Sequence, residues 1–263
     1  MGEIQGTSGL LRLNTGLLTI AGSAIGLLMG LAFYVDWLYL LSIPIILAVC
    51  YTAIYHIELL FQSIVFFAPL SINIEEYTDQ FGLFVPTEPL LFGLMLLLAF
   101  YQLKSKLIDP QFFRHPLVLI LVGYFAWLII CSITSTHPVV SFKSVLSRLW
   151  FIVPVLFFGT VLLYKEKSIS RFFWLLTIGT VLVILFTLLN HASYGFGEKE
   201  SHWVMSPFYK DHTIYGAAVA LVVPFPVMLF LMKKQSPLLS FILGLLFLII
   251  MLGLYFSYTR AAW

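Results

Sequence analysis

Charged residues are scarce in this sequence. Asp, Glu, Lys and Arg make up only 10% of its 263 residues, whereas a soluble domain carries about 25%. So little polar surface cannot cover a globule in water, which excludes an ordinary soluble domain. The formal net charge is only +2, and no basic cluster occurs, so we expect no nucleic-acid partner.

Motifs for bound cofactors are also missing. The sequence has no Walker loop, dinucleotide fingerprint, HExxH pair or paired-cysteine metal site, so we expect no metal and no cofactor. It has two cysteines, Cys50 and Cys131, and the helices predicted below place them at opposite depths, which argues against a disulfide. We expect both cysteines to be buried packing residues.

Long apolar runs take up most of the chain, of which 61% is hydrophobic. The runs are continuous rather than alternating, and runs of about 17–25 residues are long enough to cross a bilayer as helices. The sequence therefore predicts an all-α, polytopic transmembrane helix bundle that forms a single domain, 1–263. About nine helices are expected, at 16–35, 37–55, 57–74, 88–103, 115–133, 145–164, 169–190, 213–232 and 237–258.

Two features qualify this helix assignment. The third predicted span fits a transmembrane helix least well, because Glu58 and Gln62 lie in its first turns. Four interior prolines are expected to kink their helices, a distortion that membrane helices tolerate when neighbouring groups satisfy the freed carbonyls; they are Pro44, Pro154, Pro224 and Pro226.

The distribution of Lys and Arg predicts the orientation, because cytoplasmic segments are enriched in these residues. With a cytoplasmic N-terminus, nine of the fourteen lie inside: Arg12, Lys104, Lys106, Arg114, Lys165, Lys167, Arg171, Lys233 and Lys234. The other five lie outside: Lys143, Arg148, Lys199, Lys210 and Arg260. The segment 191–212 is then an outer, periplasmic loop, and the chain reaches the outer face again at its end.

The outer cations are the main candidates for chemistry. Arg148 follows Lys143 at the start of the sixth predicted helix, about one turn inside the apolar run. It either snorkels to the headgroups or faces the bundle and binds an anion, for which the guanidinium fork is well suited. Arg260 follows a run of hydroxyl residues, and Lys210 precedes the eighth predicted helix, which Asp211 or Thr213 is positioned to cap. Together these cations would suit a lipid-linked diphosphate at the membrane surface.

Other polar and aromatic side chains accompany these cations. His191, His202 and His212 are spaced about ten residues apart, which is not a metal-ligand pattern, and we interpret them as interfacial polar residues. His202 and His212 are nevertheless the candidates for a catalytic base nearest in sequence to Arg260. Aromatic residues near the outer ends could stack on sugar rings; they are Trp203, Tyr209 and Tyr215.

Two segments flank the last two predicted helices. Residues 206–216 read SPFYKDHTIYG and lead into an apolar helix that contains Pro224, and residues 256–263 read FSYTRAAW. This arrangement resembles the O-antigen ligase and polymerase superfamily of bacterial inner-membrane proteins, in which a helix ends in a Ser-Arg-Gly-Ala-like motif. Here Thr259 replaces the Ser and Ala261 replaces the Gly. The Ser-rich approach to Arg148 resembles the same family.

The resemblance implies an activity and its participants. Members of the family move glycans from undecaprenyl diphosphate at the periplasmic face, either to the lipid A core or to a growing polysaccharide. It implies a multi-pass protein of the bacterial inner membrane, whose partners are the undecaprenyl-diphosphate-linked glycan, the lipid A core or glycan acceptor, and membrane lipids. By position, Arg260 is the first match for a donor-diphosphate ligand and Arg148 the second, with Lys210 nearby. Residues 237–263 would begin the motif region.

One departure from the family's pattern and two alternative functions remain open. The family's essential histidine lies in a large periplasmic loop that would follow Trp263, so we expect this chain to be truncated before that loop and to lack the catalytic base. A secondary transporter is an alternative, but it would require broken helices with ionisable groups near mid-membrane. The second alternative is a non-catalytic, truncated membrane protein. The reading frame beyond codon 263 would distinguish it from a fragment of an enzyme.

Overall fold

The computed structural model describes residues 42–74, 83–105, 111–232 and 236–262, together with Ser23 and Leu40. The first predicted span, 16–35, lies outside the described residues apart from Ser23. The chain divides into two compact units, Met1–Leu60 and Phe61–Trp263, and each is considered by itself.

Within the described residues, five helices are long and apolar enough to cross a membrane. They are α5 (Pro116–Ile133), α6 (Pro138–Leu162), α7 (Glu166–Ser193), α8 (His212–Val222) with α9 (Pro224–Met232) as one span, and α10 (Pro237–Tyr255). Many of their large apolar side chains point outward, and Leu189, Leu221 and Phe241 are each about 70% exposed or more. Extensive apolar surface of this kind is typical of contact with lipid. The predicted class, a polytopic α-helical membrane protein, is confirmed.

Three further predicted spans correspond to shorter apolar helices: α2 (Ser42–Tyr55), α3 (Ile57–Phe67) and α4 (Thr87–Ser105). The 14 residues of α2 extend about 21 Å, which is short of the roughly 30 Å hydrocarbon core. Five spans are therefore supported within the described residues, and the predicted number of about nine stays a prediction. The predicted cytoplasmic position of the N-terminus stays a prediction.

A proline explains why α3 ends earlier than the apolar run predicts. Pro69 has no N–H to donate, and its ring disfavours helical geometry at the preceding residue. The chain turns there and forms a two-stranded antiparallel sheet of β1 (Ile72–Asn73) and β2 (Phe84–Val85). The Ser71 and Thr87 hydroxyls form a hydrogen bond beside this sheet. The sheet is a small exception to the predicted all-α fold.

The other prolines act according to their position. Pro224 separates α8 from α9 within one span, whereas Pro154 lies inside an uninterrupted α6. Prolines also occupy the first helical positions of α5, α6 and α10, where a missing N–H costs nothing. The Ser236 hydroxyl caps α10 by accepting a hydrogen bond from the Leu239 N–H at 3.3 Å.

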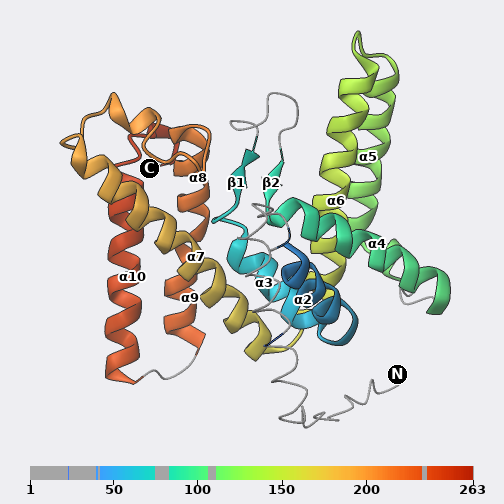
Figure 1. Cartoon of the computed structure of the whole chain (residues 1–263), viewed down its shortest axis with the longest axis horizontal. Helices are drawn as coiled ribbons and strands as arrows, with labels where there is room; N and C mark the ends of the chain where they lie inside the picture. Colours follow the sequence, from blue (N-terminus) through green and yellow to red (C-terminus); the bar gives the residue numbers. More distant parts are fainter. Residues whose placement is uncertain are drawn as a thin grey trace. The chain divides into compact units, whose positions relative to one another are not determined.

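The helices α7, α8, α9 and α10 pack together around one hydrophobic cluster (Figure 1). Its fully buried members include Ile184 from α7, Val219 from α8 and Ile250 from α10. Gly253 permits the close approach of α10 to α7, since a Cβ there would lie 2.6 Å from Cγ2 of Ile184. Small residues serve the same purpose in many membrane helix pairs.

Both cysteines are free and exposed on their helices, Cys50 on α2 and Cys131 on α5. The prediction that they are buried packing residues is therefore wrong. Neither thiol is packed into the protein core, and a small apolar thiol is well tolerated at such an exposed position. The sequence pattern could not distinguish an exposed position on an apolar helix from a buried one.

Candidate functional site

The two segments that flank the last predicted helices meet at one end of the α7–α10 group. Thr259 is buried, and its hydroxyl donates a hydrogen bond to the backbone carbonyl of His212 at 2.8 Å. Gly216 on α8 lies against the same residue, since a Cβ there would be 2.7 Å from the Thr259 Oγ1. The short 3-10 helix η5 (Arg260–Ala262) follows directly and also contacts α8. The contact therefore holds Arg260 beside the first turn of α8.

Asp211 determines how α8 begins. Its carboxylate accepts hydrogen bonds from the Thr213 N–H at 2.8 Å and the Ile214 N–H at 2.9 Å, and also from the Thr213 hydroxyl. These hydrogen bonds favour the charged form and hold the pKa of Asp211 below its ordinary value. The prediction that Asp211 caps this helix is confirmed, which gives the residue a structural role.

The predicted histidine candidates lie together at this end. The imidazole rings of His202 and His212 have centroids 4.1 Å apart and planes at 73°. His202, in the 3-10 helix η4 (Glu200–His202), is exposed, and His212 is half-buried. The Nδ1 atom of His212 is buried and has no hydrogen-bond partner among the described residues. A neutral imidazole with such a nitrogen can accept a proton.

The predicted cations Lys210 and Arg260 are both exposed. Lys210 precedes His212 by two residues, and Arg260 directly follows the Thr259 that bonds to His212. The structure therefore gathers one lysine, one arginine and two histidines around a single junction. Exposed cations in such a group can bind an anionic ligand, and the imidazoles can exchange protons with it.

His191 has a role that the sequence did not reveal. It was interpreted as an interfacial polar residue, but its side chain is only 1% exposed. Its Nε2 donates a hydrogen bond to the Gly197 carbonyl at 2.8 Å, and its ring packs against Phe196, Phe256 and Tyr258. These aromatic residues are visible in the sequence, but their positions along the chain do not show that they pack on His191.

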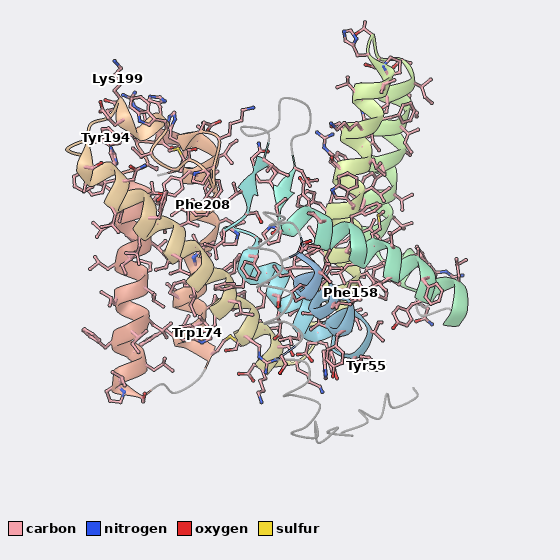
Figure 2. The ribbon with its side chains drawn as sticks, viewed as in Figure 1. Tyr55, Phe158, Trp174, Tyr194, Lys199 and Phe208 are labelled. Carbon is pink, nitrogen blue, oxygen red and sulfur yellow. The ribbon has the colours of Figure 1, made fainter. Side chains whose placement is uncertain are left out.

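His191 anchors the start of the loop that carries the other histidines. Tyr258 closes the same region by donating a hydrogen bond from its hydroxyl to the Phe196 carbonyl at 2.9 Å. The backbone has positive φ at Gly195, Phe196 and Tyr258, a conformation that costs energy for residues other than glycine. These contacts fix two sharp turns in the backbone, one at Gly195 and Phe196 and the other at Tyr258. In Figure 2, Tyr194 and Lys199 mark this loop at one end of α7, and Trp174 lies toward the other end.

The three aromatic candidates for sugar stacking differ in their accessibility. Tyr215 is 1% exposed and belongs to the hydrophobic core, so it cannot stack on a ligand. Tyr209 is half-buried against it, with ring centroids 5.6 Å apart, and burial raises the pKa of Tyr209 to about 12. Trp203 is 46% exposed and stays available for stacking.

Arg148 lies in a different environment, on α6. Its Nη1 donates a hydrogen bond to the Ser144 hydroxyl at 2.6 Å, and it lines a pocket of about 550 Å³ formed by residues 128–148. Arg260 is not among the residues that line this pocket. This pocket therefore does not bring together the two arginines that were expected to suit one lipid-linked diphosphate.

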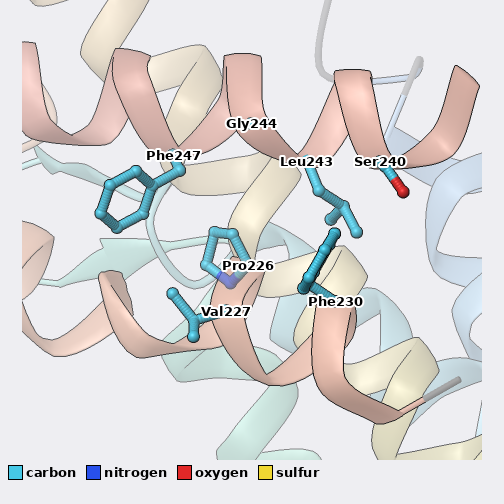
Figure 3. A pocket seen from close by; sticks show the side chains of 7 residues that line it. All are labelled: Pro226, Val227, Phe230, Ser240, Leu243, Gly244 and Phe247. Carbon is cyan, nitrogen blue, oxygen red and sulfur yellow. The ribbon is translucent and has the colours of Figure 1, made fainter. Parts of the chain in front are cut away.

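Two further observations concern ligands. No group of three or more His, Cys, Asp or Glu side chains within the described ranges could hold a metal ion. A pocket of about 190 Å³ between α9 and α10 is lined by apolar residues apart from Ser240 (Figure 3). This pocket offers space for an apolar group but no reactive side chain.

The fold and the junction define a multi-pass helical membrane protein with exposed cations and paired histidines at one end of a helix group. Comparisons with protein-family models, with curated proteins and with solved structures found no match. The function therefore has to be argued from the residues themselves.

Proposed function

We propose that this chain is a membrane glycosyltransferase of the O-antigen ligase or polymerase type. It would transfer a glycan from undecaprenyl diphosphate to the lipid A core or to a growing polysaccharide, at the periplasmic face of the bacterial inner membrane. The observation that supports it most is the hydrogen bond from Thr259 to His212 at 2.8 Å. This bond joins the two segments, 206–216 and 256–263, on which the family resemblance rests.

The proposed roles follow from the charges of the reaction. The bond between the sugar's anomeric carbon and the diphosphate oxygen breaks, and the lipid diphosphate leaves with the electron pair. Arg260 and Lys210 would bind this departing anion and stabilise its charge without a metal. Arg148, the second arginine that the resemblance matched to the diphosphate, lies in a pocket that Arg260 does not line, so it is given no part in this step.

The acceptor also has to lose a proton. Its hydroxyl oxygen forms the new bond to the anomeric carbon, and a base within hydrogen-bond reach takes the proton. His212 and His202 are the candidates at the junction, where their rings are 4.1 Å apart and His202 is exposed. The family resemblance implies a different base, a histidine in a large periplasmic loop.

One observation favours the alternative of a secondary transporter. The span His212–Met232 is interrupted between α8 and α9, and discontinuous helices are common at transporter binding sites. However, residues 213–232 contain no Asp, Glu, Lys, Arg or His. The interruption coincides with Pro224, which is sufficient to explain it. The glycosyltransferase proposal therefore takes precedence.

The proposal predicts the effect of removing the guanidinium at the junction. Arg260→Ala should lower glycan transfer from the undecaprenyl-diphosphate donor by about 10²–10³-fold, because one charge-stabilising group is lost. The protein level in the membrane should be unchanged, since Arg260 is exposed. The measurement is the amount of glycan attached to the acceptor, together with an immunoblot.

Arg114→Ala serves as the matched control for this variant. Arg114 is also an exposed arginine within a 3-10 helix, but it precedes α5 and takes no part in the junction. The control should transfer glycan normally. Normal transfer by Arg260→Ala as well would refute the proposed role of Arg260.

A further inference from the structure

The pocket around Arg148 is formed by two facing stripes of side chains. Leu128, Cys131, Ser132 and Ser135 follow the spacing i, i+3, i+4, i+7 along α5 and just beyond its end. Ser141, Ser144, Val145 and Arg148 do the same along α6. Residues with this spacing lie on one face of a helix. The two faces enclose about 550 Å³ near the turn that joins the helices.

Hydrogen-bond donors dominate the polar part of this pocket. The Ser141 hydroxyl donates to the Ser135 hydroxyl at 2.8 Å, which leaves the Ser135 proton available. Arg148 donates to the Ser144 hydroxyl at 2.6 Å, which leaves the Ser144 proton and further guanidinium N–H groups available. None of the described residues that line the pocket is acidic. The ligand that fits these groups is an anion.

The pocket also lies at the depth of lipid headgroups. The 25 residues of α6 extend about 38 Å, which exceeds the roughly 30 Å hydrocarbon core. The first turns of α6 therefore reach the interface, and the long side chain of Arg148, which bonds back to Ser144, can extend toward them. Exposed apolar side chains accompany the pocket: Ile133 and Val139 lie next to it and are 64% and 84% exposed, and Val140, which lines it, is 67% exposed. A ligand with acyl chains would find apolar contacts directly beside the polar pocket.

We propose that this pocket binds the headgroup of an anionic phospholipid of the phosphatidylglycerol type. One guanidinium matches the single charge of a phosphodiester, and the hydroxyls match its oxygens and its glycerol headgroup. A diphosphate carries more charge than the one cation that lines the described pocket can neutralise. A zwitterionic headgroup would bring an ammonium that meets no carboxylate there. The proposal does not depend on the glycosyltransferase function.

Lipid binding to the full chain tests this site. The protein is reconstituted in nanodiscs of phosphatidylcholine, and binding of fluorescent phosphatidylglycerol is measured against fluorescent phosphatidylcholine. Wild type should prefer phosphatidylglycerol, and Arg148→Gln should reduce that preference about tenfold, the effect expected for losing a charge-assisted hydrogen bond. Ser144→Ala should reduce it less, and Arg148→Lys should keep part of it, because charge remains without the planar fork.

Arg114→Gln is the matched control, since it removes one exposed arginine near the opposite end of α5. It should leave the lipid preference unchanged, and thermal unfolding should show that every variant is folded. An equal preference in wild type and Arg148→Gln would overturn the proposal.

Two competition experiments distinguish the source of the phosphate. Inorganic phosphate should not displace fluorescent phosphatidylglycerol, and displacement would assign the pocket to a soluble anion instead. Undecaprenyl diphosphate should bind equally well to wild type and Arg148→Gln. A loss of undecaprenyl diphosphate binding in Arg148→Gln would make the pocket part of the donor site and overturn the phospholipid assignment.

Discussion

At the scale of single residues, the junction depends on Gly216 as much as on the polar groups around it. A Cβ at this position would lie 2.7 Å from Oγ1 and 2.8 Å from Cβ of Thr259, and 3.1 Å from Oγ of Ser257. Contacts this short cannot persist, and Thr259 is held in place by its hydrogen bond to His212. Glycine is therefore required here for close approach rather than for an unusual backbone angle.

This contact predicts opposite effects for two glycine substitutions. Gly216→Ala should destabilise the protein by about 1–3 kcal/mol, because overpacking outweighs the gain in helix propensity. Gly244→Ala on α10 should be neutral or stabilising by up to about 1 kcal/mol, because nothing lies within 4 Å of its added Cβ. Thermal unfolding of the purified protein in detergent measures both. Equal stability of the two variants would contradict the close packing of α8 against Thr259.

The residue scale also shows what the sequence could not predict. The roles of Arg260, Lys210 and His212 were inferred from their order along the chain, but their convergence depends on a contact between residues 47 positions apart. His191 was misinterpreted because a histidine near the end of an apolar run is compatible with either the interface or the core. Its burial results from aromatic neighbours in two segments, and a sequence pattern does not reveal which segments pack together.

At the scale of helices, the length of an apolar run predicted that a helix exists there better than it predicted where the helix begins and ends. The predicted span 115–133 corresponds closely to α5, whereas the span 145–164 begins seven residues later than α6. Hydropathy reports where lipid solvates the chain, and a helix can continue beyond that region into polar sequence. Helix ends depend on local groups instead, such as Pro138 at the start of α6, Asp211 before α8 and Pro69 after α3.

The cap of α8 predicts a pH dependence. Because folding lowers the pKa of Asp211, its stabilising contribution is fully present above the pKa of the unfolded chain, about 4, and is lost as the pH falls through the lower folded value. Asp211→Asn keeps an acceptor oxygen but loses the charge and its interaction with the helix dipole. The variant should be less stable than wild type by about 0.3–1 kcal/mol at neutral pH, and the difference should shrink below about pH 4.

The measurement compares unfolding midpoints of the two proteins across this pH range, so that the titration of other acidic residues cancels. Asp211→Ala is the informative companion, since it also removes the acceptor and should cost about 1 kcal/mol at neutral pH. A difference between wild type and Asp211→Asn that stays constant with pH would show that the charge of Asp211 makes no contribution.

At the scale of the whole molecule, the class was predictable because it depends on composition. The scarcity of charge and the length of the apolar runs required a helical membrane protein, and the five long helices agree with this. The number of spans depends on finer detail, because a short apolar helix can satisfy the same hydropathy pattern as a full crossing, and the predicted number of about nine stays a prediction. The orientation depends on a small excess of inside Lys and Arg, so it needs a direct test.

The helix α7 allows such a test with one crossing. Lys167 near its start and Lys199 in the loop beyond its end are both exposed, and α7 is long enough to span the bilayer between them. Both native cysteines are free, so Cys50→Ser and Cys131→Ser give a background without thiols. In that background, Lys199→Cys should react with a membrane-impermeant maleimide in intact spheroplasts, and Lys167→Cys should react only after permeabilisation. The reverse pattern would place the junction of Thr259 and His212 on the cytoplasmic side, away from any periplasmic glycan donor, and would contradict both the predicted orientation and the proposed reaction.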